Sequence, residues 1–145
     1  MKYSLRVKFE MAYAHRLLKS FNFDCQSLHG HNGICEIYIG NEKLNEDMMV
    51  VDFKKIKEIV KENLEKKYDH STILYKEDPL VEIIKPYCNP AKFHIFEKNP
   101  TAEYMAERFT NELQEILDKE LPGTKVLSFS FEETSNNKAI YDTRN

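Results

Sequence analysis

The sequence of 145 residues is poor in several marker residues, with no tryptophan, four glycines, five prolines and three cysteines. No apolar run approaches the ~20 residues that a membrane-spanning helix needs, so we expect no membrane span. Three cysteines, a small and odd number, do not suggest a disulfide framework. Residues 1–6 alternate like a β-strand and lack the apolar core of a secretory signal. We therefore expect a protein of a reducing, cytoplasmic compartment.

The chain also lacks an excess of positive charge. Its net charge is −3 and its pI is about 6.0, so no basic surface for nucleic acid is expected. Hydrophobic residues make up 41% and charged residues 31% of the chain, which is typical of an ordinary globular protein. The length is that of one domain, and we expect a single domain over residues 1–145.

Alternating apolar and polar residues predict two long strands near the start of the chain. The first runs from Tyr3 to about His15 and the second covers residues 29–39, so a loop of residues 16–28 connects them. Apolar residues at helical spacing predict three helices, at 53–64, 79–85 and 101–117. Shorter apolar segments predict three further strands, at 92–97, 125–133 and 139–141. This order predicts an α+β fold with an antiparallel sheet, helices on one face and an insertion at residues 75–99.

Three histidines cluster around the predicted loop. His29 and His31 point to the same side of their strand because alternate side chains share a face. His15 falls on the apolar side of the preceding strand, so the three imidazoles can form a metal site with one open position. Neutral imidazole favours zinc, copper, nickel or iron, and zinc is expected because nothing indicates redox tuning. The alternative is three hydrogen-bonded structural histidines.

Two further groups could move protons. Cys25 lies among polar residues four positions before His29, and a nearby cation would increase its thiolate fraction. The alternative for Cys25 is a small buried side chain. Asp69 and His70 place a carboxylate beside an imidazole in the turn after the first helix. The alternative for His70 is an interaction with the negative end of that helix.

Glu133 continues the apolar side of the strand that carries Phe129 and Phe131. A carboxylate at such a position needs a partner, and a ligand with two parallel N–H donors would fit. The alternative is a bulge that turns Glu133 to solvent. Thr101 and Glu103 stand at the start of the predicted helix, where capping explains both.

Taken together, these motifs resemble the 6-pyruvoyl-tetrahydropterin synthase and 6-carboxy-tetrahydropterin synthase family in order and spacing. The resemblance covers residues 9–141 and rests on six motifs: Ala14-His15-Arg16, Cys25-x-x-x-His29-Gly30-His31-Asn32, Asp52-Phe53, Asp69-His70, Pro100-Thr101-Ala102-Glu103 and Glu133-Thr134. It implies that three residues hold Zn²⁺: His15, His29 and His31. It also implies that Cys25 moves protons on the substrate side chain, with Asp69 and His70 as the second acid–base pair.

The resemblance further implies that Glu133 binds the amino-pyrimidine edge of a pterin, assisted by Thr101 and Glu103. The family has the tunnelling fold, in which antiparallel four-stranded sheets with helices on one face join into a barrel on oligomerisation. Its members are commonly homo-oligomers, above all hexamers, with active sites between subunits. Asp69 and His70 would then serve the Cys25 of a neighbouring subunit.

The gap of three residues between Cys25 and His29 resembles the bacterial 6-carboxy-tetrahydropterin synthases of queuosine biosynthesis. That branch converts 7,8-dihydroneopterin triphosphate to 6-carboxy-tetrahydropterin, with release of acetaldehyde and triphosphate. One alternative is a 6-pyruvoyl-tetrahydropterin synthase, which eliminates triphosphate only. Another is a protein that binds zinc and pterin without turnover. Arg16 and Lys19 are candidates for contact with the triphosphate because they follow His15 in the loop.

Overall fold

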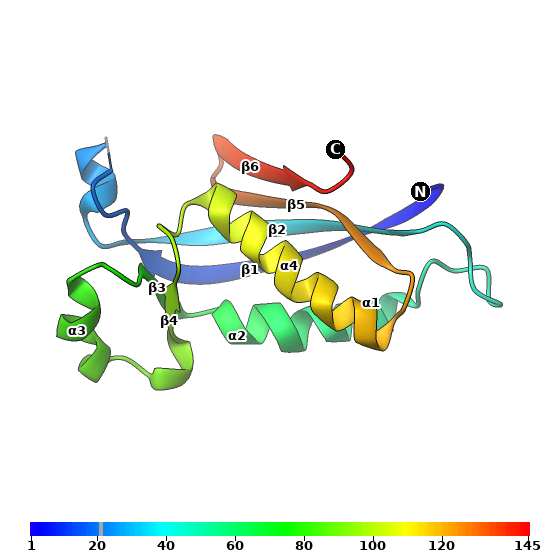
Figure 1. The fold of residues 1–145 in the computed structure, drawn as a ribbon, viewed down its shortest axis with the longest axis horizontal. Helices are drawn as coiled ribbons and strands as arrows, with labels where there is room; N and C mark the ends of the chain where they lie inside the picture. Colours follow the sequence, from blue (N-terminus) through cyan, green and yellow to red (C-terminus); the bar gives the residue numbers. More distant parts are fainter. Residues whose placement is uncertain (21) are drawn as a thin grey trace.

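A computed structural model describes residues 1–20 and 22–145. The described residues form one six-stranded sheet with the order β4-β3-β1-β2-β5-β6 (Figure 1). Its strands have these bounds: β1 Tyr3–His15, β2 His29–Asn41, β3 Ser71–Tyr75, β4 Phe93–Phe96, β5 Lys125–Thr134 and β6 Asn137–Asp142. The longer helical segments are α1 Phe53–Val60, the π-helical η2 Lys61–Glu65, α2 Lys66–Tyr68, α3 Leu80–Ile84 and α4 Ala102–Glu120. Three 3-10 turns complete the set: η1 Phe23–Gln26, η3 Lys85–Tyr87 and η4 Pro90–Lys92.

The long hairpin of β1 and β2 forms as its alternation predicts. The two strands pair antiparallel without interruption, from Tyr3 opposite Asn41 to His15 opposite His29. In β1 the apolar positions from Leu5 onward are buried, whereas the polar positions between them are exposed. Register is therefore determined by the buried face, and it brings the first two histidines opposite each other.

Helices cover the buried face of this sheet. Asp52 caps α1 and Thr101 caps α4, each by accepting a hydrogen bond from a backbone N–H of the first turn. The apolar sides of α1, η2, α2 and α4 share one core cluster with the strands. Aromatic contacts join the two sides, since the Phe109 ring of α4 lies 5.9 Å from Phe129 and 6.1 Å from Phe131.

The prediction of a four-stranded antiparallel sheet is wrong in strand number and partly in direction. Strands β1, β2, β5 and β6 do form an antiparallel sheet, but β3 adds to β1 in parallel and β4 adds to β3 in parallel. No strand was predicted at residues 71–75. Three of these five residues are buried, on both faces of the strand, so the sequence there shows no alternation of apolar and polar residues.

The predicted helix at 53–64 continues to Tyr68 through the π-helical turn η2. Asp69 then leaves the helix in an extended conformation, and His70 follows with a positive φ of 61°. Histidine is among the residues that tolerate this left-handed region, which turns the chain sharply from α2 into β3. No helix in the described part of the chain is long and apolar enough to cross a membrane.

Candidate metal centre

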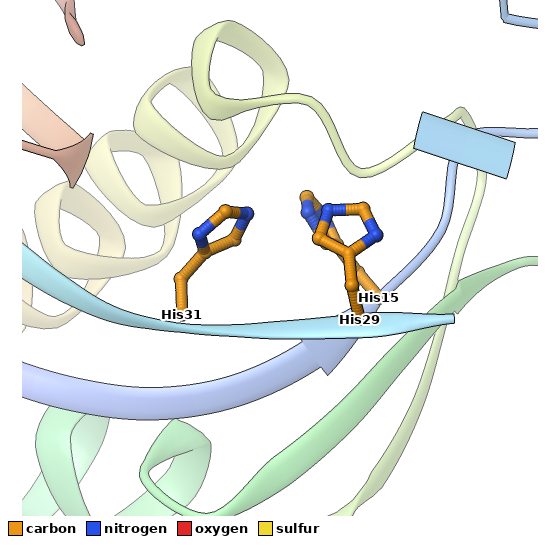
Figure 2. Close-up of side chains that lie close together, drawn as sticks. All are labelled: His15, His29 and His31. Atoms are coloured by element: carbon orange, nitrogen blue, oxygen red, sulfur yellow. The ribbon is translucent and has the colours of Figure 1, made fainter. Parts of the chain in front are cut away.

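The three predicted histidines meet at the end of the hairpin. His15 ends β1, while His29 and His31 begin β2 on the same face (Figure 2). One ring nitrogen from each lies within 4.8 Å of the others. The ring centroids are 4.7 Å apart for His15 and His29, and 4.9 Å apart for His29 and His31. Three imidazoles at this spacing can coordinate one ion.

Backbone carbonyls orient two of the rings. His15 Nδ1 lies 2.8 Å from the Pro100 carbonyl, and His29 Nδ1 lies 2.6 Å from the Ser27 carbonyl. A carbonyl only accepts, so each Nδ1 carries the proton and each Nε2 keeps its lone pair. Burial lowers the pKa of His15 to about 4, against the effect of the Pro100 carbonyl, so the ring is neutral at pH 7. Rings oriented in this way, with Nε2 directed away from the carbonyl, suit metal coordination.

Glu133 lies at the edge of this group and not in solvent. Its Oε1 is 3.6 Å from His15 Nε2 and accepts a 3.0 Å hydrogen bond from the Tyr13 hydroxyl. The register of β5 and β6 shifts between Glu132 and Thr134, yet the carboxylate still faces Tyr13. Its side chain is 25% exposed, so solvent and ligand can reach it.

Tyr13, the partner of Glu133, was not predicted from the sequence. Burial raises the pKa of Tyr13, and the nearby Glu133 raises it further, so the phenol stays protonated as a donor. A Cβ at Gly33 would lie 2.9 Å from the Phe131 ring and 3.1 Å from the Tyr13 ring, so glycine leaves room for both. The available signal was the position of Tyr13 two residues before His15, on the same face of β1.

Asp69 and His70 are fixed at the edge of β1. Ala12 N–H donates to Asp69 Oδ1 at 2.8 Å, and His70 N–H donates to the Ala12 carbonyl at 2.7 Å. Burial would raise the pKa of Asp69, but the hydrogen bonds from Ala12 and His70 outweigh it and lower the pKa. His70 Nδ1 is 2.9 Å from Asp69 Oδ2, and the His70 side chain is 80% exposed. The pair therefore presents an oriented imidazole to the outside of the chain.

His70 lines an open hollow of about 530 Å³ formed with residues of β1, β2 and β3. Cys25 is not among the described residues that line this hollow. Cys25 instead lies in the turn η1, partly buried and with a free thiol. Cys25 and the Asp69–His70 pair therefore do not share this hollow within one chain.

The remaining predicted residues have local roles in the structure. Thr101 Oγ1 accepts from Tyr104 N–H at 3.1 Å as the cap of α4, and Glu103 is exposed in the first turn. Arg16, a candidate for phosphate contact, forms an ion pair with the buried Asp78. Lys19 is exposed.

Comparison with known proteins agrees with this architecture. The profile of the family described as 6-pyruvoyl tetrahydropterin synthase matches residues 4–144. A 6-carboxy-5,6,7,8-tetrahydropterin synthase of Rickettsia conorii is 34% identical over 113 residues, which cover 78% of this chain and 80% of that protein. A protein of the same name from Aquifex aeolicus is 34% identical over 122 residues, which cover 81% of this chain and 75% of that protein. The chain belongs to the 6-pyruvoyl tetrahydropterin synthase family.

Solved structures share the fold over nearly the whole chain. An uncharacterized protein of Wolinella succinogenes superposes with a TM-score of 0.77 at 23% identity, covering 98% of both chains. The 6-pyruvoyl tetrahydropterin synthase of Caenorhabditis elegans gives a TM-score of 0.70 at 21% identity, covering 97% of this chain and 94% of that one. The tunnelling fold that the resemblance implies is thus confirmed, with six strands in place of four.

Proposed function

We propose that this chain is a zinc-dependent 6-carboxy-tetrahydropterin synthase that acts on 7,8-dihydroneopterin triphosphate. One observation carries the proposal: ring nitrogens of three imidazoles lie within 4.8 Å of one another beside the carboxylate of Glu133. In this proposal the metal site and the carboxylate that binds the pterin are adjacent. The names of the curated relatives support the same reaction class.

The donor set fits zinc. Three nitrogen ligands with an open position are typical of catalytic zinc sites, and the carbonyls of Pro100 and Ser27 accept from Nδ1 of His15 and His29 and so orient both rings. Zinc held by His15, His29 and His31 would supply Lewis acidity toward the hydroxyl groups of the substrate side chain.

The protein residues would then divide the remaining work. Glu133, held at one oxygen by Tyr13, would accept hydrogen bonds from the amino-pyrimidine edge of the pterin, with Thr101 and Glu103 assisting. Cys25 as thiolate would remove a proton from the substrate side chain. His70, oriented by Asp69, would exchange a second proton.

The acid–base groups would come together between subunits. His70 is exposed, and the hollow it lines does not include Cys25 among the described residues. In a homo-oligomer, with the hexamer as the proposed form, the Asp69 and His70 of one subunit would serve the Cys25 of its neighbour. Active sites would then form only on assembly.

The proposed products are 6-carboxy-tetrahydropterin, acetaldehyde and triphosphate, as a step of queuosine biosynthesis. The test is product analysis after incubation of zinc-loaded protein with 7,8-dihydroneopterin triphosphate. Acetaldehyde beside a carboxylated pterin is the expected result. A pterin that keeps its three-carbon side chain would instead indicate 6-pyruvoyl chemistry, and no product would indicate a binding protein.

A Cys25→Ala variant tests the assigned base. We expect it to lose turnover while it keeps one zinc ion per chain, because the three histidines are intact. Cys88→Ala is the matched control, since Cys88 is also a partly buried free thiol but lies in the segment after α3. Full activity of Cys25→Ala would contradict the role of Cys25.

A further inference from the structure

The chain that leaves β1 is held at three points by residues 78–100. The Pro100 carbonyl accepts from His15 Nδ1 at 2.8 Å. Asp78, whose side chain is fully buried, binds Arg16 through two hydrogen bonds, one of them 2.7 Å between Arg16 Nε and Asp78 Oδ2. Figure 1 shows that this segment, with α3, lies at the same end of the sheet as the loop after β1.

The third point is Asn99, which binds both backbone groups of Leu18. Leu18 N–H donates to Asn99 Oδ1 at 2.9 Å, and Asn99 Nδ2 donates to the Leu18 carbonyl at 3.0 Å. The Asn99 side chain thus bonds the N–H and the carbonyl of Leu18, as a neighbouring strand would do inside the sheet. The partly buried amide makes two hydrogen bonds across 81 positions of sequence.

A short backbone path leads from this contact to Cys25. Leu17, the neighbour of Leu18, donates its N–H to the Cys25 carbonyl at 2.8 Å. On the other side, Cys25 N–H donates to the Asn22 carbonyl at 3.1 Å. Leu17 therefore holds the Cys25 backbone directly, and Gln26 Nε2, which donates to the Ser20 carbonyl at 2.9 Å, ties the same turn to the loop.

Apolar packing gives the turn around Cys25 little support. None of the residues of η1 is buried, and Phe23 is 81% exposed. Without buried side chains, the place of such a loop depends on its hydrogen bonds. Asn99 provides two of them from the segment that follows β4, which is held to the sheet by its pairing with β3.

We propose that Asn99 is a positioning residue for Cys25: it holds the Leu17–Leu18 backbone, and thereby the thiol, in the place needed for proton transfer. The inference rests on the proposed function in that Cys25 is taken as the base. The proposal also gives residues 75–99 a role, because this segment carries the Asn99 side chain that holds the loop after β1.

The test uses the zinc-loaded full chain with Cys88→Ser, so that Cys25 is the reactive thiol and Cys35 stays fully buried. Asn99→Ala is compared with Asn99→Asp, which keeps the acceptor for Leu18 N–H but loses the donor. The matched control is Asn89→Ala, because the Asn89 side chain accepts from Ala91 N–H within its own turn and Asn89 lies outside the loop that holds Cys25. Four quantities are measured: kcat, KM, the rate of iodoacetamide alkylation of Cys25, and zinc per chain.

For Asn99→Ala we expect kcat to fall about tenfold with KM little changed, since two neutral hydrogen bonds are lost. Alkylation of Cys25 should become several-fold faster because the loop opens more often. Asn99→Asp should lie between, Asn89→Ala should match the parent, and zinc should stay at one per chain, as the Pro100 carbonyl remains.

Unchanged kcat and alkylation in Asn99→Ala would overturn the proposal, and so would an equal effect of Asn89→Ala. Loss of zinc together with kcat would also overturn it, because Asn99 would then act through His15. If the parent itself shows no turnover, the proposed function fails. The alkylation rates would still decide whether Asn99 holds Cys25.

Discussion

Replacing Tyr13 by phenylalanine should weaken pterin binding while leaving the fold intact. The hydroxyl donates to Glu133 Oε1 at 3.0 Å, so it fixes the carboxylate and leaves Oε2 for a ligand. The ring itself is 4% exposed and packs 5.5 Å from Phe131 and 5.0 Å from His15, contacts that phenylalanine preserves. The change therefore removes one hydrogen bond and little packing.

The expected magnitude follows from the exposure of the acceptor. A hydrogen bond to a charged group contributes about 1.5–3 kcal/mol when both partners are desolvated. Glu133 is 25% exposed, so water replaces part of the lost bond and the remaining cost is about 1 kcal/mol. This corresponds to roughly a fivefold increase in the dissociation constant for a pterin.

The assay is calorimetric titration of zinc-loaded protein with 7,8-dihydroneopterin, with thermal unfolding measured on the same samples. Tyr38→Phe is the control, since Tyr38 is 43% exposed and lies on the face of β2 opposite to that of His29 and His31. An unchanged dissociation constant in Tyr13→Phe, or an equal change in Tyr38→Phe, would refute the reasoning that Tyr13 orders Glu133 for the ligand.

Two further predictions concern stability. In metal-free protein, burial lowers the pKa of His15 from 6.5 to about 4, so between these values the unfolded chain binds more protons and stability falls as pH falls. The free energy of unfolding should fall by roughly 3 kcal/mol in total, measured by urea unfolding at a series of pH values. An equally steep dependence of this free energy on pH in His15→Gln would contradict the prediction. Asp78→Ala should lower the free energy of unfolding by about 3 kcal/mol, because it leaves the partly buried guanidinium of Arg16 without its ion-pair partner. The measurement is urea unfolding at pH 7. A loss no larger than that of an exposed pair, below about 1 kcal/mol, would show that the ion pair is not structural.

Parity along the strands was enough to predict much of the site. His29 and His31 share a face of β2, and the register of the hairpin brings His15 opposite His29. The same reasoning placed Glu133 on the core side of its strand, where it contacts Tyr13. These inferences depend on local periodicity, which the hydrophobic face of the sheet enforces.

Contacts between distant segments could not be predicted in this way. Strand β3 lacks alternation because it is buried on both faces, so the parallel edge of the sheet was missed. The hydrogen bonds of Asn99 with Leu18, and of Asp78 with Arg16, join segments far apart in sequence. No periodic pattern marks such pairs, since each depends on how loops pack after the sheet has formed.

The most direct test of the account is a zinc titration of metal-stripped protein with 7,8-dihydroneopterin triphosphate as substrate. Turnover should be absent at the start, rise linearly and level off at one zinc ion per chain, and His29→Ala should stay inactive throughout. Turnover by the stripped protein, or zinc binding without any gain in turnover, would contradict the claim that the three histidines hold a catalytic metal.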